Sequence, residues 1–184
     1  MLYYPIKDEE VWRFSEKIKG RSFVWINTAI AYNKQVFAAA HELYHLWFEN
    51  DGEIILKTDV EETDSADSIS ESELKANRFA AEFLINEELL LQEMRTYGVD
   101  KNKIGIKDIL KLSNLFAVPY KTMVKRLYES KLIGKMKYDE LMKLSNEQIK
   151  ICRNRLGLSL PTPNNKIGLN SLIDKAMELY ERKK

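Results

Sequence analysis

The sequence contains one cysteine, Cys152, and only two histidines in 184 residues. A single cysteine cannot form a disulfide within the chain, which excludes a disulfide-stabilised fold and agrees with a reducing, cytoplasmic location. No run approaches the roughly 18 apolar residues of a membrane-spanning helix, and the first residues lack the basic and apolar parts of a signal peptide. Internal repeats and low-complexity tracts are also missing. We therefore expect a globular cytoplasmic protein that does not bind membranes.

Charge is distributed unevenly along the chain, although the net charge is only +1. Residues 49–73 contain ten acidic residues and one lysine, whereas residues 95–184 contain twenty basic and nine acidic residues. A basic half is expected in proteins that bind nucleic acid or acidic partners, but solvated helix surfaces produce it more often. The charge pattern therefore leaves a contact with DNA open.

The two histidines, His41 and His45, lie four residues apart in the apolar run QVFAAAHELYHLWFE. Residues at i and i+4 share one face of a helix, so both imidazoles can bind one zinc ion while Glu42 reaches its open coordination position. Bound zinc lowers the pKa of its water to about 7, and a neighbouring carboxylate can take the proton as that water attacks a carbonyl. The pattern His-Glu-x-x-His predicts a zinc hydrolase with Glu42 as general base.

Strands are expected before this helix, and helices after it. A loop at residues 28–33 leads to the zinc helix, with Asn33 as the expected N-cap of a helix that begins near Lys34. A second long helix is expected from about Ser70 to Tyr97, with a break at Asn86. The expected strands are a hairpin over residues 11–27, with its turn at 19–20 and its second strand at 22–27, and a short strand at 53–58. The later helices are expected at residues 107–116, 119–130, 138–155 and 170–181.

A catalytic zinc generally has three protein ligands, and since there is no third histidine the missing one must be a carboxylate or Cys152. Glu73 is the best carboxylate because it shares a helix face with small residues, which allow two helices to approach closely. However, Ser70 and Glu73 also have the spacing of a capping box, in which the glutamate only bonds back to the start of its helix. The spacing does not choose between these two roles.

Residues 22–130 resemble the ImmA/IrrE family of metallopeptidases. The stretch INTAIAYNKQVFAAAHELYH is similar to the family's strand, loop and zinc-motif helix, and ESELKANRFAAEFLI is similar to its second signature. The resemblance implies that His41, His45 and Glu73 bind one zinc ion and that Glu42 is the general base. The segments before residue 20 and after residue 130 show no such similarity.

The sequence departs from the family pattern at two positions. Tyr44 stands where the family usually has glycine, and Asn86 stands where a proline commonly follows the second signature. Neither change removes a ligand, but we expect Tyr44 to alter the packing beside the metal.

The fold expected from these features is α+β and gluzincin-like. A small antiparallel or mixed sheet packs on the zinc helix, and an all-helical C-terminal part with a helix-turn-helix-like hairpin follows. We expect a metallopeptidase domain at residues 1–98 and a helical region at residues 99–184 that includes the hairpin at 106–130.

The resemblance also implies a function. Members of the family typically occur in bacteria, phages and mobile elements, and those best understood cleave a helix-turn-helix transcriptional repressor. We therefore expect a zinc-dependent endopeptidase that acts on such a repressor in a phage, mobile-element or stress-response circuit. With no third histidine, the oxyanion of the reaction must be stabilised by another group, and Tyr32, Tyr44 and Arg78 are candidates.

An alternative function is a DNA- or repressor-binding module with little or no proteolytic activity. Lys121, Lys125 and Arg126 would then be the exposed contacts of segment 106–130. A helical hairpin packed against the peptidase domain would show the same apolar periodicity. The apolar positions expected in the hairpin core are Ile109, Leu112, Leu115, Val118, Val124 and Leu127.

Two substitutions separate the ligand and cap roles of Glu73. A lost cap costs about 0.5–2 kcal/mol and leaves zinc in place. A lost anionic ligand leaves two neutral imidazoles to hold a dication, so zinc binding and proteolysis should collapse in Glu73→Gln and persist in Ser70→Ala. Metal analysis of both purified variants is the measurement. If Glu73→Gln keeps its zinc, the third ligand is to be sought at Asp64, Asp67 or Glu71.

Overall fold

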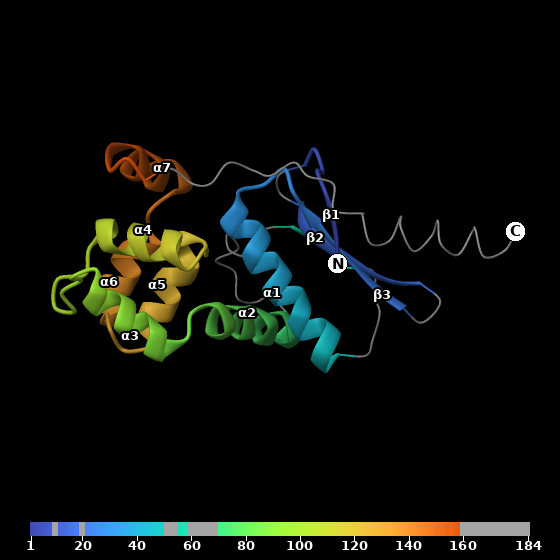
Figure 1. Ribbon diagram of the computed structural model, residues 1–184, viewed down its shortest axis with the longest axis horizontal. Coiled ribbons are helices and arrows are strands. Elements are labelled where there is room, and N and C mark those ends of the chain that lie inside the picture. Colours follow the sequence, from blue (N-terminus) through green and yellow to red (C-terminus); the bar gives the residue numbers. More distant parts are fainter. Residues whose placement is uncertain (9–10, 19–20, 50–54, 59–69, 159–184) are drawn as a thin grey trace, which may run out of the picture.

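The computed structural model describes residues 1–8, 11–18, 21–49, 55–58 and 70–158. The strands are β1 (Leu2–Tyr4), β2 (Val11–Ile18), β3 (Arg21–Asn27) and β4 (Ile55–Thr58). The helices are α1 (Tyr32–Phe48), α2 (Glu71–Leu84), α3 (Glu87–Thr96), α4 (Ile106–Leu115), α5 (Tyr120–Glu129), α6 (Lys135–Met142) and α7 (Asn146–Arg155). Figure 1 shows α1 between the sheet and α2, with α3 to α7 gathered away from the sheet. The predicted α+β class is confirmed.

The described strands form one mixed sheet in the order β1-β3-β2-β4. β2 pairs antiparallel with both β3 and β4, and β1 pairs parallel with β3. The hairpin predicted over residues 11–27 is present as β2 and β3, and its turn at 19–20 lies outside the described residues. The third predicted strand is present as β4.

The core beneath the site combines large residues of the sheet with small residues of the helices. Trp12 of β2 and Ile26 of β3 are buried against α1. Ala38 of α1 and Ala76 and Ala80 of α2 are fully buried, with no exposed surface. A methyl side chain keeps neighbouring backbones close, so these alanines hold α1 and α2 near enough for their polar side chains to meet.

The start of α1 differs from the prediction, whereas the break before α3 agrees with it. α1 begins at Tyr32 with Ala31 as its N-cap, so the prediction of Asn33 as the cap is wrong. Asn33 is instead buried, and its Nδ2 donates to the carbonyl oxygen of Val118 at 3.3 Å. The break predicted at Asn86 is confirmed, because its Oδ1 accepts two backbone N–H groups and caps α3.

The helices α3 to α7 surround a second hydrophobic core. The single helix expected at residues 138–155 is two helices, α6 and α7. Ser145 and Gln148 form a capping box that starts α7, which explains the interruption. The helix expected at residues 170–181 lies outside the described residues, and the domain division at residue 98 stays a prediction. None of the described helices has the length and apolar content needed to cross a membrane.

Segment 106–130 forms two helices, α4 and α5, but two details of its prediction are wrong. Leu115 is 44% exposed and so does not belong to the core, whereas the other five predicted core positions are buried. Arg126 is buried, and its Nε donates to the carbonyl oxygen of Ile85 at 3.0 Å. Arg126 therefore ties α5 to the end of α2 and is not an exposed contact.

The buried side chain of Asn27 joins three segments of the chain, so its substitution tests the fold. Oδ1 accepts from the backbone N–H groups of Ile6 and Ala29, and Nδ2 donates to the carbonyl oxygens of Asp8 and Val11. Asn27→Ala leaves these buried groups without partners and should lower the free energy of unfolding by about 2–4 kcal/mol. Urea denaturation measures the change.

The matched control is Asn102→Ala, because Asn102 is exposed on a loop. It should change the free energy of unfolding by no more than about 0.5 kcal/mol. Equal effects of the two substitutions would contradict the structural role of Asn27.

Candidate metal centre

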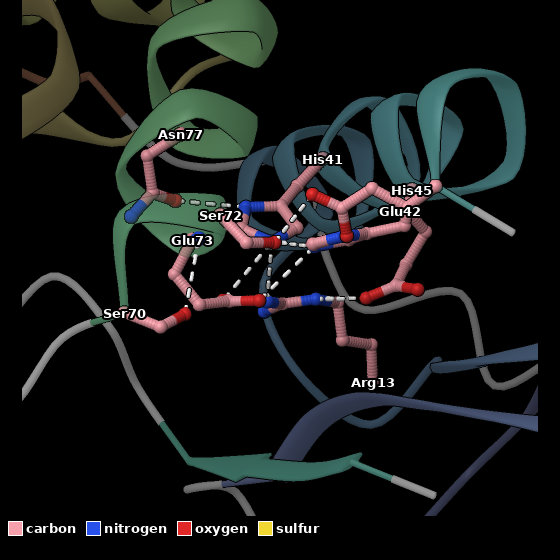
Figure 2. A network of polar contacts seen from close by, with 9 residues as sticks. Arg13, His41, Glu42, His45, Ser70, Ser72, Glu73 and Asn77 are labelled. Carbon is pink, nitrogen blue, oxygen red and sulfur yellow. Dashed lines mark hydrogen bonds and ion pairs between the residues drawn. The ribbon is translucent and has the colours of Figure 1, made fainter. Parts of the chain in front are cut away.

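The polar side chains of the candidate site meet where β2, α1 and α2 come together, as Figure 2 shows. His41, Glu42 and His45 lie on α1, and one ligand atom of each lies within 4.8 Å of the others. Glu73 reaches the histidines from the first turn of α2, and Arg13 reaches them from β2. His45 is half-buried, and the other four side chains are buried.

Nδ1 of the His41 ring has a defined hydrogen-bond partner. This atom lies 2.8 Å from Oδ1 of Asn77, which is an acceptor, so Nδ1–H donates there. Burial, and then the nearby Arg13 guanidinium, lower the pKa of His41 well below its usual range, which keeps the ring neutral at pH 7. His41 therefore presents an unprotonated Nε2, which is the form that binds a metal ion.

His45 is oriented by a carboxylate. Its Nδ1–H donates to Oε2 of Glu49 at 2.6 Å, and Oε1 of Glu49 accepts a hydrogen bond from Oγ of Ser72, also at 2.6 Å. These contacts direct Nε2 of His45 toward His41, and the two Nε2 atoms are 3.0 Å apart. Outer partners of this kind fix the tautomer and direction of metal-binding histidines.

Glu73 lies against both imidazoles. Its Oε2 is 3.2 Å from Nε2 of His41, and its Oε1 is 3.0 Å from Nε2 of His45. Because His41 is neutral, the first contact is a close approach of two acceptors and not an ion pair. Ser70 does cap α2, since its Oγ accepts from the backbone N–H of Glu73 at 3.3 Å. The cap thus uses the backbone of Glu73 and leaves its carboxylate at the histidines.

The donor set suits a tetrahedral metal ion. Metal–ligand distances of about 2.0–2.2 Å place neighbouring ligand atoms of a tetrahedron about 3.3–3.6 Å apart. The separations between the two imidazoles and Glu73 are 3.0, 3.0 and 3.2 Å, slightly shorter than these values. Lone pairs and carboxylate oxygens that converge in this way repel one another, and a cation between them relieves the repulsion. The residues present therefore fit a bound metal ion.

Glu42 lies beside the donors with one oxygen engaged and one available. Its Oε1 accepts a charge-assisted hydrogen bond from Nε of Arg13. Its Oε2 is buried and has no hydrogen-bond partner among the described residues. A buried carboxylate oxygen of this kind is suited to accept a proton from a bound water.

Three side chains considered for the oxyanion lie elsewhere or play another part. Tyr32 is 43% exposed at the start of α1, and the exposed Arg78 pairs with Glu82. Tyr44, which replaces the glycine of the family pattern, packs edge-on against His45 with 5.7 Å between ring centroids. Its ring also contacts Phe48 and Phe79, so Tyr44 supports His45 from an aromatic cluster.

Two of the other predicted ligands, Cys152 and Glu71, do not lie at the centre. Cys152 lies on α7, packed against the second core. Glu71 is exposed and pairs with Lys75 at 2.7 Å, and Asp64 and Asp67 lie outside the described residues. Among the described residues, the group that could hold a metal ion is His41, Glu42 and His45, and Glu73 lies against both of its imidazoles.

Sequence reasoning missed the residues around the ligands, Arg13, Glu49, Ser72 and Asn77. Glu49 and Asn77 carried a signal, because each is spaced four residues from a site residue, Glu49 from His45 and Asn77 from Glu73. Arg13 also carried one, since it is a charged residue flanked by Trp12 and Phe14 in a predicted strand. Such a charge inside an apolar run indicates a buried partner.

The contact between Asn77 and His41 predicts a loss of metal affinity when the acceptor is removed. Asn77→Ala frees the His41 ring to rotate and to change tautomer, so affinity for a divalent metal ion should fall about 10- to 100-fold. Metal titration against a competing chelator measures the change. Asn154→Ala, an exposed asparagine of α7, is the control, and equal affinities in the two variants would contradict the role of Asn77.

Comparison with known proteins gives one match. The family model Peptidase_M78, described as the IrrE N-terminal-like domain, matches residues 1–128. The match covers more than two thirds of the chain and includes the segment before residue 20, whose sequence alone shows no similarity to the family. Searches of curated proteins and of solved structures gave no match. The whole candidate centre, Arg13 included, falls inside the matched region.

Proposed function

Because this chain belongs to the IrrE N-terminal-like family of peptidases, we propose that it is a zinc-dependent endopeptidase. One zinc ion per chain would be held by His41, His45 and Glu73. The observation that supports this is the convergence of two imidazole Nε2 atoms and one carboxylate at 3.0–3.2 Å, each imidazole fixed from behind by its own acceptor.

A zinc ion held by His41, His45 and Glu73 would supply a water of lowered pKa and a Lewis acid for the carbonyl of the scissile bond. Glu42 is the general base, because its buried Oε2 is free to take a proton while its Oε1 is anchored by Arg13. The same carboxylic acid then donates the proton to the leaving amine. Burial lowers the pKa of His41, which favours the neutral ring that binds a metal ion.

We propose a helix-turn-helix transcriptional repressor as the substrate, in the cytoplasm of a bacterium or in the circuit of a phage or mobile element. The support is the resemblance of the two zinc signatures to those of peptidases with such substrates. The test is incubation of the zinc-loaded protein with the repressor encoded beside it, followed by mass spectrometry of the products. An intact repressor after prolonged incubation, beside cleavage of an unrelated peptide, would exclude this substrate.

The alternative of a DNA-binding module gains little support from α5. Six of its ten residues are buried, among them Arg126, and its exposed residues include the acidic Glu129. A helix that reads a major groove needs an exposed polar face rich in donors and cations. The packing of α5 therefore favours a structural role for segment 106–130.

Glu42→Gln tests the proposed base. The amide keeps the size of the side chain and can still accept a hydrogen bond from Arg13, but it cannot take a proton. Cleavage should fall by about 10²- to 10⁴-fold while one zinc per chain is retained. Zinc content by atomic spectroscopy and cleavage rate on the same preparation are the measurements.

Glu88→Gln on the exposed first turn of α3 is the matched control and should leave both quantities unchanged. Full cleavage by Glu42→Gln would refute the mechanism. Loss of zinc from Glu42→Gln would instead make Glu42 a ligand.

A further inference from the structure

Arg13 is a buried cation inside a cluster that is also suited to hold a metal cation. The residue is 2% exposed, and its guanidinium contacts three of the site residues. Nε donates to Oε1 of Glu42, and Nη2 lies 3.1 Å from Oε2 of Glu73 and 2.7 Å from Nε2 of His41. Figure 2 shows the arginine approaching the ligands from the strand side.

The position of Arg13 follows from an irregularity in the sheet. The pairing of β2 with β4 shifts register between Val11 and Arg13. Consecutive strand residues normally point to opposite faces, yet Trp12 packs in the core with α1 and Arg13 enters the site on α1. Bulges redirect side chains and occur next to active sites, which explains how both residues face the helix layer.

Arg13 and a metal ion require the same atoms. Because His41 is neutral with its proton on Nδ1, its single Nε2 lone pair either accepts from Nη2 of Arg13 or binds a metal ion. Oε2 of Glu73 likewise either accepts a hydrogen bond from Nη2 of Arg13 or binds a metal ion. A metal ion about 2.0–2.2 Å from both atoms would lie too close to Nη2 for either hydrogen bond to persist.

We propose that Arg13 is the internal competitor of the metal ion and thereby sets the affinity of the site for zinc. This rests on the proposed zinc site. In the metal-free protein the guanidinium neutralises the buried Glu42 and Glu73 and holds the donors together. Entry of zinc displaces Nη2 from His41 and Glu73, whereas the contact of Nε with Glu42, an atom that zinc does not need, persists.

The charges of the cluster determine whether removal of Arg13 strengthens or weakens zinc binding. The buried Glu42 and Glu73 carry two negative charges and Arg13 carries one positive charge, so the arginine cancels part of the negative charge that attracts a zinc ion. Without Arg13, a zinc ion balances the two carboxylates. Removal of the arginine should therefore tighten zinc binding and, in the absence of zinc, leave two buried carboxylates uncompensated.

The experiment compares Arg13→Met with the unaltered chain by zinc titration against a chromogenic chelator and by thermal unfolding with and without zinc. Zinc affinity should rise at least about tenfold, since a unit positive charge at close range is removed. The melting temperature of the metal-free protein should fall by roughly 6–20 °C. Saturating zinc should restore most of that loss.

Arg126→Met is the matched control, because Arg126 is also buried and bonded, but to a backbone carbonyl away from the site. It should lower the melting temperature equally with and without zinc and leave the affinity unchanged. If Arg13→Met fails to fold even with zinc, Arg13→Gln serves instead, because its neutral amide removes the positive charge and can still donate a hydrogen bond to Glu42, and it should also bind zinc more tightly.

Equal or weaker zinc binding by the Arg13 variants would overturn the inference and leave the proposed zinc site intact. Failure of both the unaltered chain and the variant to bind zinc would refute the proposed function itself. Zinc binding by the variant alone would support the competition by Arg13 and refute the zinc-dependent activity proposed for the unaltered chain.

Discussion

Burial of several ionisable groups in one place is the constraint on which the site depends. Two carboxylates, a neutral imidazole and a guanidinium lie together out of water, and each would be costly to bury alone. The arrangement is sustained because β2, α1 and α2 each contribute a group that offsets another. The fully buried alanines of α1 and α2 make this possible, since a larger side chain would separate the helices by more than a hydrogen bond can span.

The part of the site that follows from helix geometry could be predicted from the sequence. His41 and His45 lie on one face because α1 is a helix, and Glu42 lies beside them for the same reason. The spacing alone left two roles open for Glu73, zinc ligand or helix cap, because the position of its side chain depends on how α2 packs on α1. The structure shows that cap and site contact coexist, since they use different atoms of one residue.

The failures of prediction share a physical cause. Asn33 and Arg126 have sequence positions typical of a helix cap and an exposed cation, yet each donates to a backbone carbonyl of a distant segment. Arg13 reaches the centre because a register shift redirects it, and no local pattern encodes a register shift. Such contacts are decided by tertiary packing, which overrides local preference wherever a buried carbonyl would otherwise lack a donor. The strands β2, β3 and β4, most helices and the α+β class needed only periodicity, whereas β1 was not predicted.

The contact between Arg13 and Glu73 joins residues 60 positions apart in the chain. A chain growing on the ribosome exposes β2 and α1 before α2 exists, so the histidines emerge without their carboxylate partner. Closing so long a loop also carries an entropic cost that local helix formation does not. An incomplete chain that ends before Glu73 therefore cannot assemble the cluster, because the contacts of Glu73 with both histidines form only after α2 has packed on α1.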